Sequence, residues 1–160
     1  MAQAPEEWLG PVLSARRWRI AVAESCTGGL IAHRITNVPG SSAYFDRGFI
    51  AYSNEAKMEL LGVPQETLVA HGAVSEPCAR AMAEGARRAA GCEVGLSVTG
   101  IAGPSGGTAE KPVGTVFMAL ALPSGTRCLS FRFQGGRQAI KEQTAEEALQ
   151  MLRAALGEEG

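Results

Sequence analysis

Residues 19–29 read Arg19-Ile20-Ala21-Val22-Ala23-Glu24-Ser25-Cys26-Thr27-Gly28-Gly29 and contain three consecutive structural signals. The short apolar run predicts a buried strand, and the polar residues and two glycines after it predict a turn. Apolar residues then recur at helical spacing from Leu30 through Ile35. The sequence therefore predicts a strand, a polar turn and a helix in this order, which is a unit typical of α/β domains.

Periodicity and capping residues on either side of this unit predict the remaining elements. A helix over residues 5–17 comes first, because apolar residues recur there at helical spacing behind Pro5. Asn54 is placed to cap a helix that ends before Gly62. The other predicted elements are a strand at 45–52, helices at 65–70 and 75–91, strands at 93–99, 113–122 and 126–133, and a final helix after Gly136.

The order of these elements predicts the fold class. Helices alternate with strands early in the chain, and the turn Pro123-Ser124-Gly125 joins two strands into a hairpin in the C-terminal half. We therefore expect a three-layer α/β/α fold with a mixed sheet. The 160 residues hold enough apolar material for one core, so a single domain over residues 1–160 is expected.

Charge and hydrophobic pattern exclude several classes of function. A net charge of -1 provides no broad positive field, so no nucleic acid partner is expected. No apolar run approaches the roughly 18 residues of a membrane span, and the N-terminus lacks the apolar part of a secretion signal. We expect a cytoplasmic protein without membrane contact. The four cysteines form no Cys-x-x-Cys pair and no cluster with histidine, which argues against disulfides and zinc.

Two polar turns that follow predicted strands are the first candidates for a functional site. Residues 24–29 place the Ser25 hydroxyl, the Cys26 thiol and the Thr27 hydroxyl at a helix start, where free N–H groups attract negative charge, although ordinary helix capping uses the same residues. Residues 100–108 expose many backbone N–H groups, as a phosphate site requires, although a flexible loop has this composition too. Their glycines match neither a P-loop nor a dinucleotide fingerprint, so neither ATP hydrolysis nor an NAD redox cofactor is expected.

Lys57 is a third candidate, because it is predicted in the first turn of the helix capped by Asn54. The helix dipole disfavours a positive charge there. A lysine acts as a base near neutral pH only if its pKa falls by roughly three units from about 10.4, and burial together with the dipole can cause that shift. On sequence position alone, a surface lysine with an ordinary pKa is the alternative interpretation.

Five motifs occur in an order that resembles the CinA C-terminal domain family. They are Ala23-Glu24-Ser25-Cys26-Thr27-Gly28-Gly29, Tyr52-Ser53-Asn54-Glu55-Ala56-Lys57, Gly72-Ala73-Val74-Ser75-Glu76-Pro77, Gly100-Ile101-Ala102-Gly103-Pro104 and Lys111-Pro112-Val113-Gly114-Thr115-Val116. The resemblance covers nearly the whole chain. It includes the PncC-type proteins, in which this domain stands alone as a nicotinamide mononucleotide (NMN) deamidase.

The resemblance implies a reaction and a set of site residues. The reaction is hydrolysis of the NMN carboxamide to nicotinic acid mononucleotide and ammonia in pyridine nucleotide salvage, without a metal or organic cofactor. Ser25 is the implied nucleophile, Lys57 its general base, and Tyr52 the residue that orients the lysine or the carboxamide. The implied substrate-binding residues are Thr27, Gly28, Ser42, Thr99, Gly100, Gly103, Gly106 and Arg137.

For two of these implied contacts we expect a specific group of the substrate to be bound. Arg137 opens the final helix and is expected to bind the substrate phosphate with two N–H groups. Backbone N–H groups near Thr27 and Gly28 are expected to bind the oxyanion that forms during hydrolysis.

Other interpretations of the same residues stay open. Cys26 with Glu24 and Lys57 would form a cysteine-centred amidase, because thiolates are better intrinsic nucleophiles than alcohols. A non-catalytic nucleotide-binding or regulatory module related to competence or DNA damage is a second alternative, and an amidase for another small carboxamide is a third. We also expect a homodimer, since twofold dimers are the commonest closed assembly.

Overall fold

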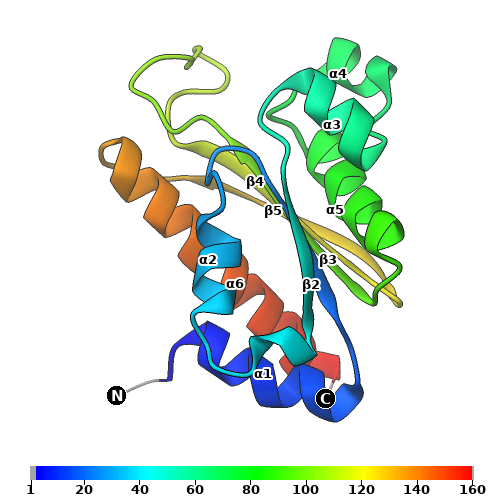
Figure 1. The fold of residues 1–160 in the computed structure, drawn as a ribbon. Coiled ribbons are helices and arrows are strands. Elements are labelled where there is room, and N and C mark those ends of the chain that lie inside the picture. Colours follow the sequence, from blue (N-terminus) through cyan, green and yellow to red (C-terminus); the bar gives the residue numbers. More distant parts are fainter. Residues whose placement is uncertain (1–2, 160) are drawn as a thin grey trace.

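A five-stranded sheet with the strand order β2-β1-β3-β4-β5 forms the centre of the computed structural model (Figure 1). The structure describes residues 3–159. The strands are β1 (Ile20–Glu24), β2 (Phe45–Ile50), β3 (Val94–Gly100), β4 (Thr115–Leu122) and β5 (Gly125–Arg132). β1 pairs in parallel with both β2 and β3, whereas β4 pairs antiparallel with β3 and with β5. The predicted mixed sheet and C-terminal-half hairpin are confirmed.

Helices cover both faces of this sheet, as the predicted three-layer fold requires (Figure 1). One face is covered by α1 (Pro5–Arg16), α2 (Leu30–Thr36) and α6 (Arg137–Glu159). The other face is covered by α3 (Asn54–Leu61), α4 (Gln65–His71) and α5 (Glu76–Ala90). A short 3-10 helix, Ser41–Ala43, precedes β2. The α/β class predicted from the sequence is therefore confirmed.

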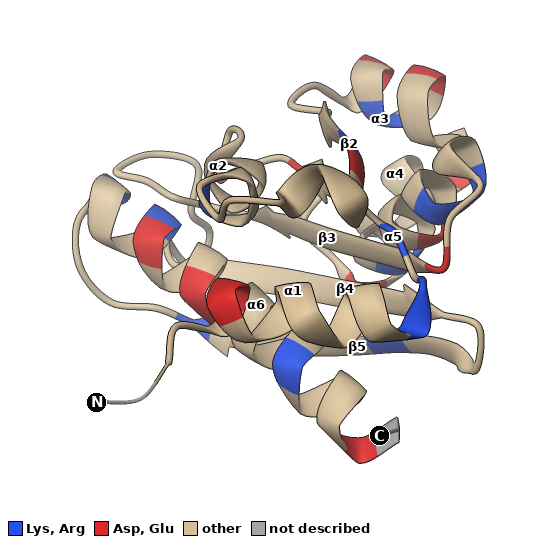
Figure 2. Ribbon diagram, turned by 60° about the horizontal axis from the view of Figure 1, so that its bottom comes forward, with Lys and Arg blue, Asp and Glu red and all other residues tan. Residues whose placement is uncertain are grey.

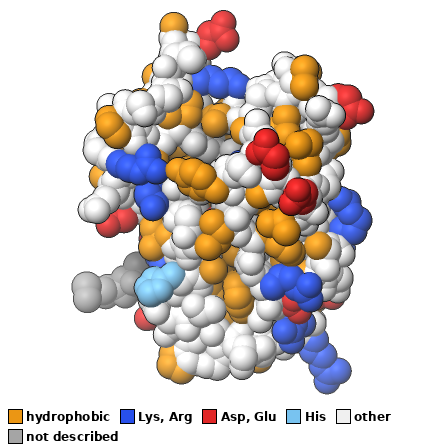
Figure 3. All heavy atoms as spheres, turned by 45° about the horizontal axis from the view of Figure 1, so that its top comes forward, with side chains coloured by type: hydrophobic (Ala, Val, Ile, Leu, Met, Phe, Trp, Pro, Cys, Tyr) orange, Lys and Arg blue, Asp and Glu red, His pale blue; other side chains and the backbone are white. Residues whose placement is uncertain are grey.

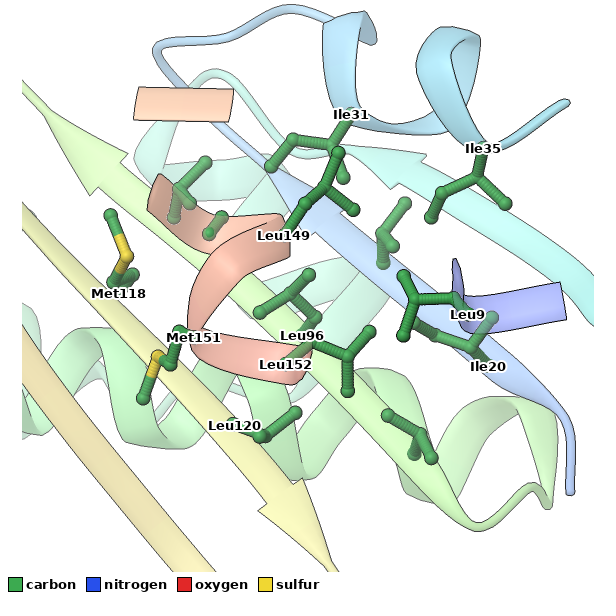
Figure 4. Packing of buried hydrophobic residues seen from close by; sticks show 14 of the residues in the cluster. Leu9, Ile20, Ile31, Ile35, Leu96, Met118, Leu120, Leu149, Met151 and Leu152 are labelled. Carbon is green, nitrogen blue, oxygen red and sulfur yellow. The ribbon is translucent and has the colours of Figure 1, made fainter. Parts of the chain in front are cut away.

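The two faces of the sheet differ because side chains alternate along each strand. In β1, Ile20 and Val22 pack on the side of α6, whereas Ala21 and Ala23 pack on the side of α5. The larger cluster lies on the α6 side, where Leu149 and Leu152 meet Leu96 of β3 (Figure 4). Small residues on the opposite side let α5 approach the sheet closely.

The structure corrects the predicted start of α3. Asn54 is not the cap but the first helical residue, and Ser53 caps the helix, with its Oγ accepting a hydrogen bond from Ala56 N at 3.0 Å. Serine and asparagine have similar cap preferences, so their order could not be told from composition. β2 also ends at Ile50, two residues earlier than predicted. The carbonyl groups of Ala51 and Tyr52 are therefore free of the sheet and available to a side chain.

Charged residues of both signs are interspersed over the helices and strands (Figure 2). One group of charged side chains connects the three helices on the α6 side of the sheet. Arg34 of α2 pairs with Glu6 of α1 at 2.7 Å and with Glu146 of α6 at 2.8 Å. Within residues 3–159, no helix combines the length and the apolar character needed to cross a membrane.

Candidate active site

The carboxyl ends of the three parallel strands meet at one end of the sheet, and a cavity of about 210 Å³ lies there. Ser25 follows β1, Tyr52 follows β2, and Gly100 ends β3. The cavity is lined by Ser25, Cys26, Tyr52, Asn54, Lys57, Ala73, Val74, Thr99, Gly100, Ala102 and Arg137. Figure 3 shows this end of the molecule, where hydrophobic side chains lie between basic and acidic ones. Ligands of α/β sheets commonly bind in this position.

A buried lysine and a serine hydroxyl are in direct contact inside this cavity. Lys57 is 1% exposed, and its Nζ lies 3.0 Å from Ser25 Oγ. The amine also donates to the carbonyl groups of Ala51 at 3.0 Å and Tyr52 at 2.9 Å. None of the carboxylates in residues 3–159 forms an ion pair or hydrogen bond with it. The structure thus joins two residues 32 positions apart in the chain.

Burial lowers the pKa of Lys57, because the charged ammonium loses its hydration inside the protein. Of the two causes expected from the sequence, burial and the helix dipole, burial is the largest cause of the shift. A neutral amine has two N–H bonds and one lone pair. When the two N–H groups donate to Ala51 and Tyr52, the lone pair is left facing Ser25, whose hydroxyl then donates to it. This is the arrangement of a general base with its nucleophile.

A buried carboxylate organises the turn that carries Ser25. Glu24 is 1% exposed, and its Oε1 accepts hydrogen bonds from the Thr27 hydroxyl at 2.5 Å and the Ile31 N–H at 2.9 Å. The same oxygen accepts a longer bond from Gly29 N–H at 3.3 Å, and Oε2 accepts one from Ala32 N–H at 2.9 Å. The carboxylate therefore satisfies N–H groups at the start of α2 and holds the turn in one conformation.

We predict that Glu24→Gln lowers the free energy of unfolding by about 1.5–3 kcal/mol, the contribution of hydrogen bonds to a charged acceptor. Glutamine replaces one carboxylate oxygen with an NH2 group, which cannot accept a hydrogen bond from a backbone N–H. At least one of these bonds is therefore lost. Urea denaturation measures the change. Glu59→Gln, at an exposed position of α3, is the control and is expected to stay within about 0.5 kcal/mol of the wild type. Equal stability of the Glu24 variant and the wild type would contradict the assigned role.

The thiol of Cys26 lies next to Ser25 but in a different electrostatic state. Burial raises its pKa to about 12, and the negative charge of Glu24 acts in the same direction. The raised pKa keeps the thiol protonated, as the Ser25 hydroxyl is, so either group needs a base in order to attack. Lys57 contacts Ser25 Oγ and makes no hydrogen bond with the Cys26 thiol. The environment favours Ser25 over Cys26 for nucleophilic attack.

Tyr52 and Arg137 lie at the rim of the cavity and contact each other. Arg137 donates through Nη2 to the Tyr52 hydroxyl at 3.0 Å and through Nη1 to the carbonyl of Gly103 at 2.6 Å. Tyr52 is 59% exposed, and Lys57 contacts its backbone carbonyl, whereas the Tyr52 phenol contacts Arg137. The rim thus links the loops after β2 and β3 with the start of α6.

Only some of the remaining substrate-binding residues expected from the sequence line this cavity. Thr99 and Gly100 line the cavity, and the Thr99 hydroxyl donates to the Ala73 carbonyl at 2.9 Å. Gly28 and Thr27 line a neighbouring cavity instead. Ser42 lies on the 3-10 helix before β2, at the opposite end of the parallel strands, and exposed Gly106 is outside both linings.

The backbone around Ser25 provides N–H groups for a developing negative charge. Gly28 N–H donates to the Ser25 carbonyl at 3.2 Å, so it is not free for an oxyanion, contrary to the sequence-based expectation. The Thr27 N–H has no acceptor among the described residues, and the Cys26 N–H is hydrogen-bonded only with the thiol of its own side chain. Two adjacent N–H groups that donate to no backbone carbonyl, beside a nucleophile, are the geometry that an oxyanion hole uses.

Sequence reasoning missed two parts of this site. Glu24 was considered only as a partner of Cys26, although an acid between a buried strand and a helix start is the signal for an anion that satisfies free N–H groups. The backbone carbonyl groups of Ala51 and Tyr52 left no signal, because any residue supplies a carbonyl. Within residues 3–159, no three His, Cys, Asp or Glu side chains are grouped closely enough to hold a metal ion.

The fold and this site define an α/β domain with a buried serine–lysine pair at the carboxyl ends of its parallel strands. The chain belongs to the CinA C-terminal domain family, which it matches over residues 2–156. A CinA-like protein of Anaeromyxobacter dehalogenans is 59% identical over 144 residues, which make up 90% of this chain and 35% of that protein. The chain therefore spans about a third of the length of the curated relatives it matches.

Two solved structures are similar to the chain over most of their length. The competence/damage inducible protein CihA from Agrobacterium tumefaciens is 42% identical, with a TM-score of 0.92 and 98% coverage of each chain. The competence damage-inducible protein A from Klebsiella pneumoniae is 35% identical, with a TM-score of 0.92, covering 96% of this chain and 95% of that chain. These similarities support the family assignment over the whole domain.

Proposed function

We propose that this protein hydrolyses the carboxamide of NMN to nicotinic acid mononucleotide and ammonia. The observation that carries the proposal is the contact of 3.0 Å between Ser25 Oγ and the buried amine of Lys57, which has no carboxylate partner among the described residues. A serine with an uncharged lysine beside it is a nucleophile with its own base, as amide hydrolysis requires. Family membership supports the same chemistry.

In the first half of the proposed reaction, the Ser25 hydroxyl oxygen attacks the carboxamide carbon while Lys57 takes the hydroxyl proton. The carbonyl oxygen becomes an oxyanion, and the N–H groups of Cys26 and Thr27 stabilise it. Lys57 then returns the proton to the amide nitrogen. The carbon–nitrogen bond breaks, ammonia leaves, and a nicotinoyl ester of Ser25 remains.

In the second half, Lys57 activates a water molecule that attacks this ester. The water oxygen bonds to the carbonyl carbon, and Lys57 returns the proton to Ser25 Oγ as the ester bond breaks. The products are nicotinic acid mononucleotide and the original enzyme. One lysine therefore acts as base and acid in both halves, which requires a pKa well below that of a surface lysine.

The size of the cavity supports a planar ring as the group that enters it. Its 210 Å³ is below the roughly 300 Å³ at which pockets begin to enclose drug-sized ligands. A nicotinamide ring would fill this space, and the ribose and phosphate would extend past the rim.

Incubation of the purified protein with NMN and measurement of ammonia tests the proposal. Release of ammonia is expected from NMN and not from nicotinamide or glutamine, because the ribose phosphate provides binding outside the cavity. NAD is the third comparison, since it presents the same carboxamide on a larger nucleotide. Faster release from glutamine or nicotinamide than from NMN would identify an amidase for another carboxamide, and no release from any of them would contradict enzymatic amide hydrolysis.

A further inference from the structure

A second cavity of about 410 Å³ lies next to the reactive one. Ser25 and Cys26 line the reactive cavity and Thr27 to Gly29 line the second, so one continuous turn contributes to the lining of both. The start of α6 divides in the same way, because Arg137 lines the first cavity and Gln138 the second. The second cavity is thus placed to receive the part of a substrate that does not fit into the first.

The cation of this second cavity is Lys141, a half-buried residue of α6. Its Nζ lies 3.7 Å from the position that a Cβ on Gly28 would occupy, so the ammonium points at the bare wall of the turn. It forms no hydrogen bond or ion pair with any residue that the structure describes. His33 and the exposed Glu142 are the other titratable groups lining this cavity. The cavity therefore presents an unpaired positive charge.

Neighbouring cations and donors are already engaged. Arg34 pairs with Glu6 and Glu146, and Arg137 is held by Gly103 and Tyr52. The Thr27 hydroxyl donates to Glu24. Lys141 differs from them because its amine has no protein partner among the described residues.

Lys141 also lies at a suitable separation from the reacting groups. Gly28 is three residues after Ser25, and the turn between them is closed by the bond of 3.2 Å from Gly28 N–H to the Ser25 carbonyl. Three residues span at most about 10 Å even when fully extended. The Cα atoms of Ser25 and Gly28 therefore lie no more than about 10 Å apart, and the ammonium lies beside Gly28.

We propose that Lys141 binds the phosphate of the mononucleotide substrate in the second cavity. The proposal rests on the proposed function and adds the residue that selects a phosphorylated substrate. It assigns the phosphate contact to Lys141 and not to Arg137, which the resemblance implied and whose Nη1 and Nη2 groups already donate to Gly103 and Tyr52. A lysine ammonium is a compact positive charge, and it donates hydrogen bonds to phosphate oxygens.

Steady-state kinetics with NMN and with nicotinamide riboside, which lacks the phosphate, test this role. Lys141→Ala is expected to raise KM for NMN by about 10-fold to 100-fold, with kcat and the constants for the riboside nearly unchanged. Lys141→Arg keeps the charge and is expected to restore the preference for NMN. Arg88→Ala removes an exposed cation in the last turn of α5 as a matched control. An unchanged ratio of kcat/KM for NMN to that for the riboside in Lys141→Ala would overturn the proposal.

A binding measurement separates this inference from the proposed function. Inorganic phosphate is titrated into the wild type and the Lys141→Ala variant, and the amide resonances of Gly28 and Gly29 are followed by NMR. Saturable shifts are expected in the wild type and not in the variant, whether or not ammonia is released from NMN. No saturation in the wild type, or equal shifts in both proteins, would refute a phosphate site at Lys141.

Discussion

Ser25→Ala is expected to reduce ammonia release from NMN by about 10⁴-fold or more, as loss of the nucleophile does in other hydrolases. The hydroxyl that contacts Lys57 at 3.0 Å is the only group lost, and the substitution leaves the turn held by Glu24 intact. Cys26→Ala is the matched variant one residue away. It is expected to keep most of the activity, because Lys57 contacts the Ser25 hydroxyl and makes no hydrogen bond with the Cys26 thiol.

Kinetics of the two variants at neutral pH decide between the two nucleophiles. Mass spectrometry of the wild type during turnover adds a direct test, since the nicotinoyl ester is expected on the peptide that contains Ser25. Loss of activity in Cys26→Ala with retention in Ser25→Ala would overturn the serine mechanism and favour the cysteine-centred alternative.

Lys57→Met is expected to reduce kcat by about 10²-fold to 10⁴-fold, the usual contribution of a general base. Methionine is close to lysine in shape but has no amine to accept the Ser25 proton. Lys57→Arg is expected to be equally inactive, because the guanidinium stays protonated in proteins. Substantial activity in the arginine variant would show that position 57 supplies a charge and not a base.

The stability of the Lys57→Met variant separates a catalytic loss from a folding defect. A buried amine without a carboxylate partner costs free energy that a thioether avoids, so the variant is expected to unfold at the same or a higher urea concentration than the wild type. Unfolding at a much lower urea concentration would mean that Lys57 is retained for packing.

The lowered pKa of Lys57 also sets the sign of two pH dependences. kcat/KM is expected to rise with pH through this pKa, since only the neutral amine accepts the Ser25 proton. Between the lowered pKa and the ordinary value of about 10.4, the unfolded chain binds a proton that the folded chain lacks. The contribution of Lys57 to the free energy of unfolding therefore increases with pH across this window, and the increase is expected to be absent in Lys57→Met.

Local sequence patterns predicted most secondary-structure elements of this protein. The alternation of Ile20 and Val22 with Ala21 and Ala23, and the helical spacing after Gly29, reflect contacts within one element and its immediate cover, which neighbouring residues determine. Element ends were less well predicted. Ser53 and Asn54 cap equally well in isolation, and only the path of the backbone after β2 decided between them.

The positions of the site residues relative to one another depended on the tertiary structure more than the secondary-structure elements did. Ser25, Thr99 and Lys57 meet because β1, β2 and β3 are parallel neighbours, so the residues after their carboxyl ends converge. Ser42 lies between Ser25 and Lys57 in the sequence. It precedes β2 and does not follow it, so it lies at the other end of the sheet. A residue that is close to the site residues in sequence is therefore not necessarily close to them in the fold.

The sequence alone determined the α/β class through local order, and its resemblance to the CinA C-terminal domain family implied Ser25 and Lys57 as the reactive pair. The tertiary structure alone decided that the amine is buried, that two backbone carbonyl groups orient it, and that burial raises the pKa of the Cys26 thiol. The physical reason is that desolvation and hydrogen bonding to the backbone arise from atoms far along the chain, which assemble only when the sheet forms.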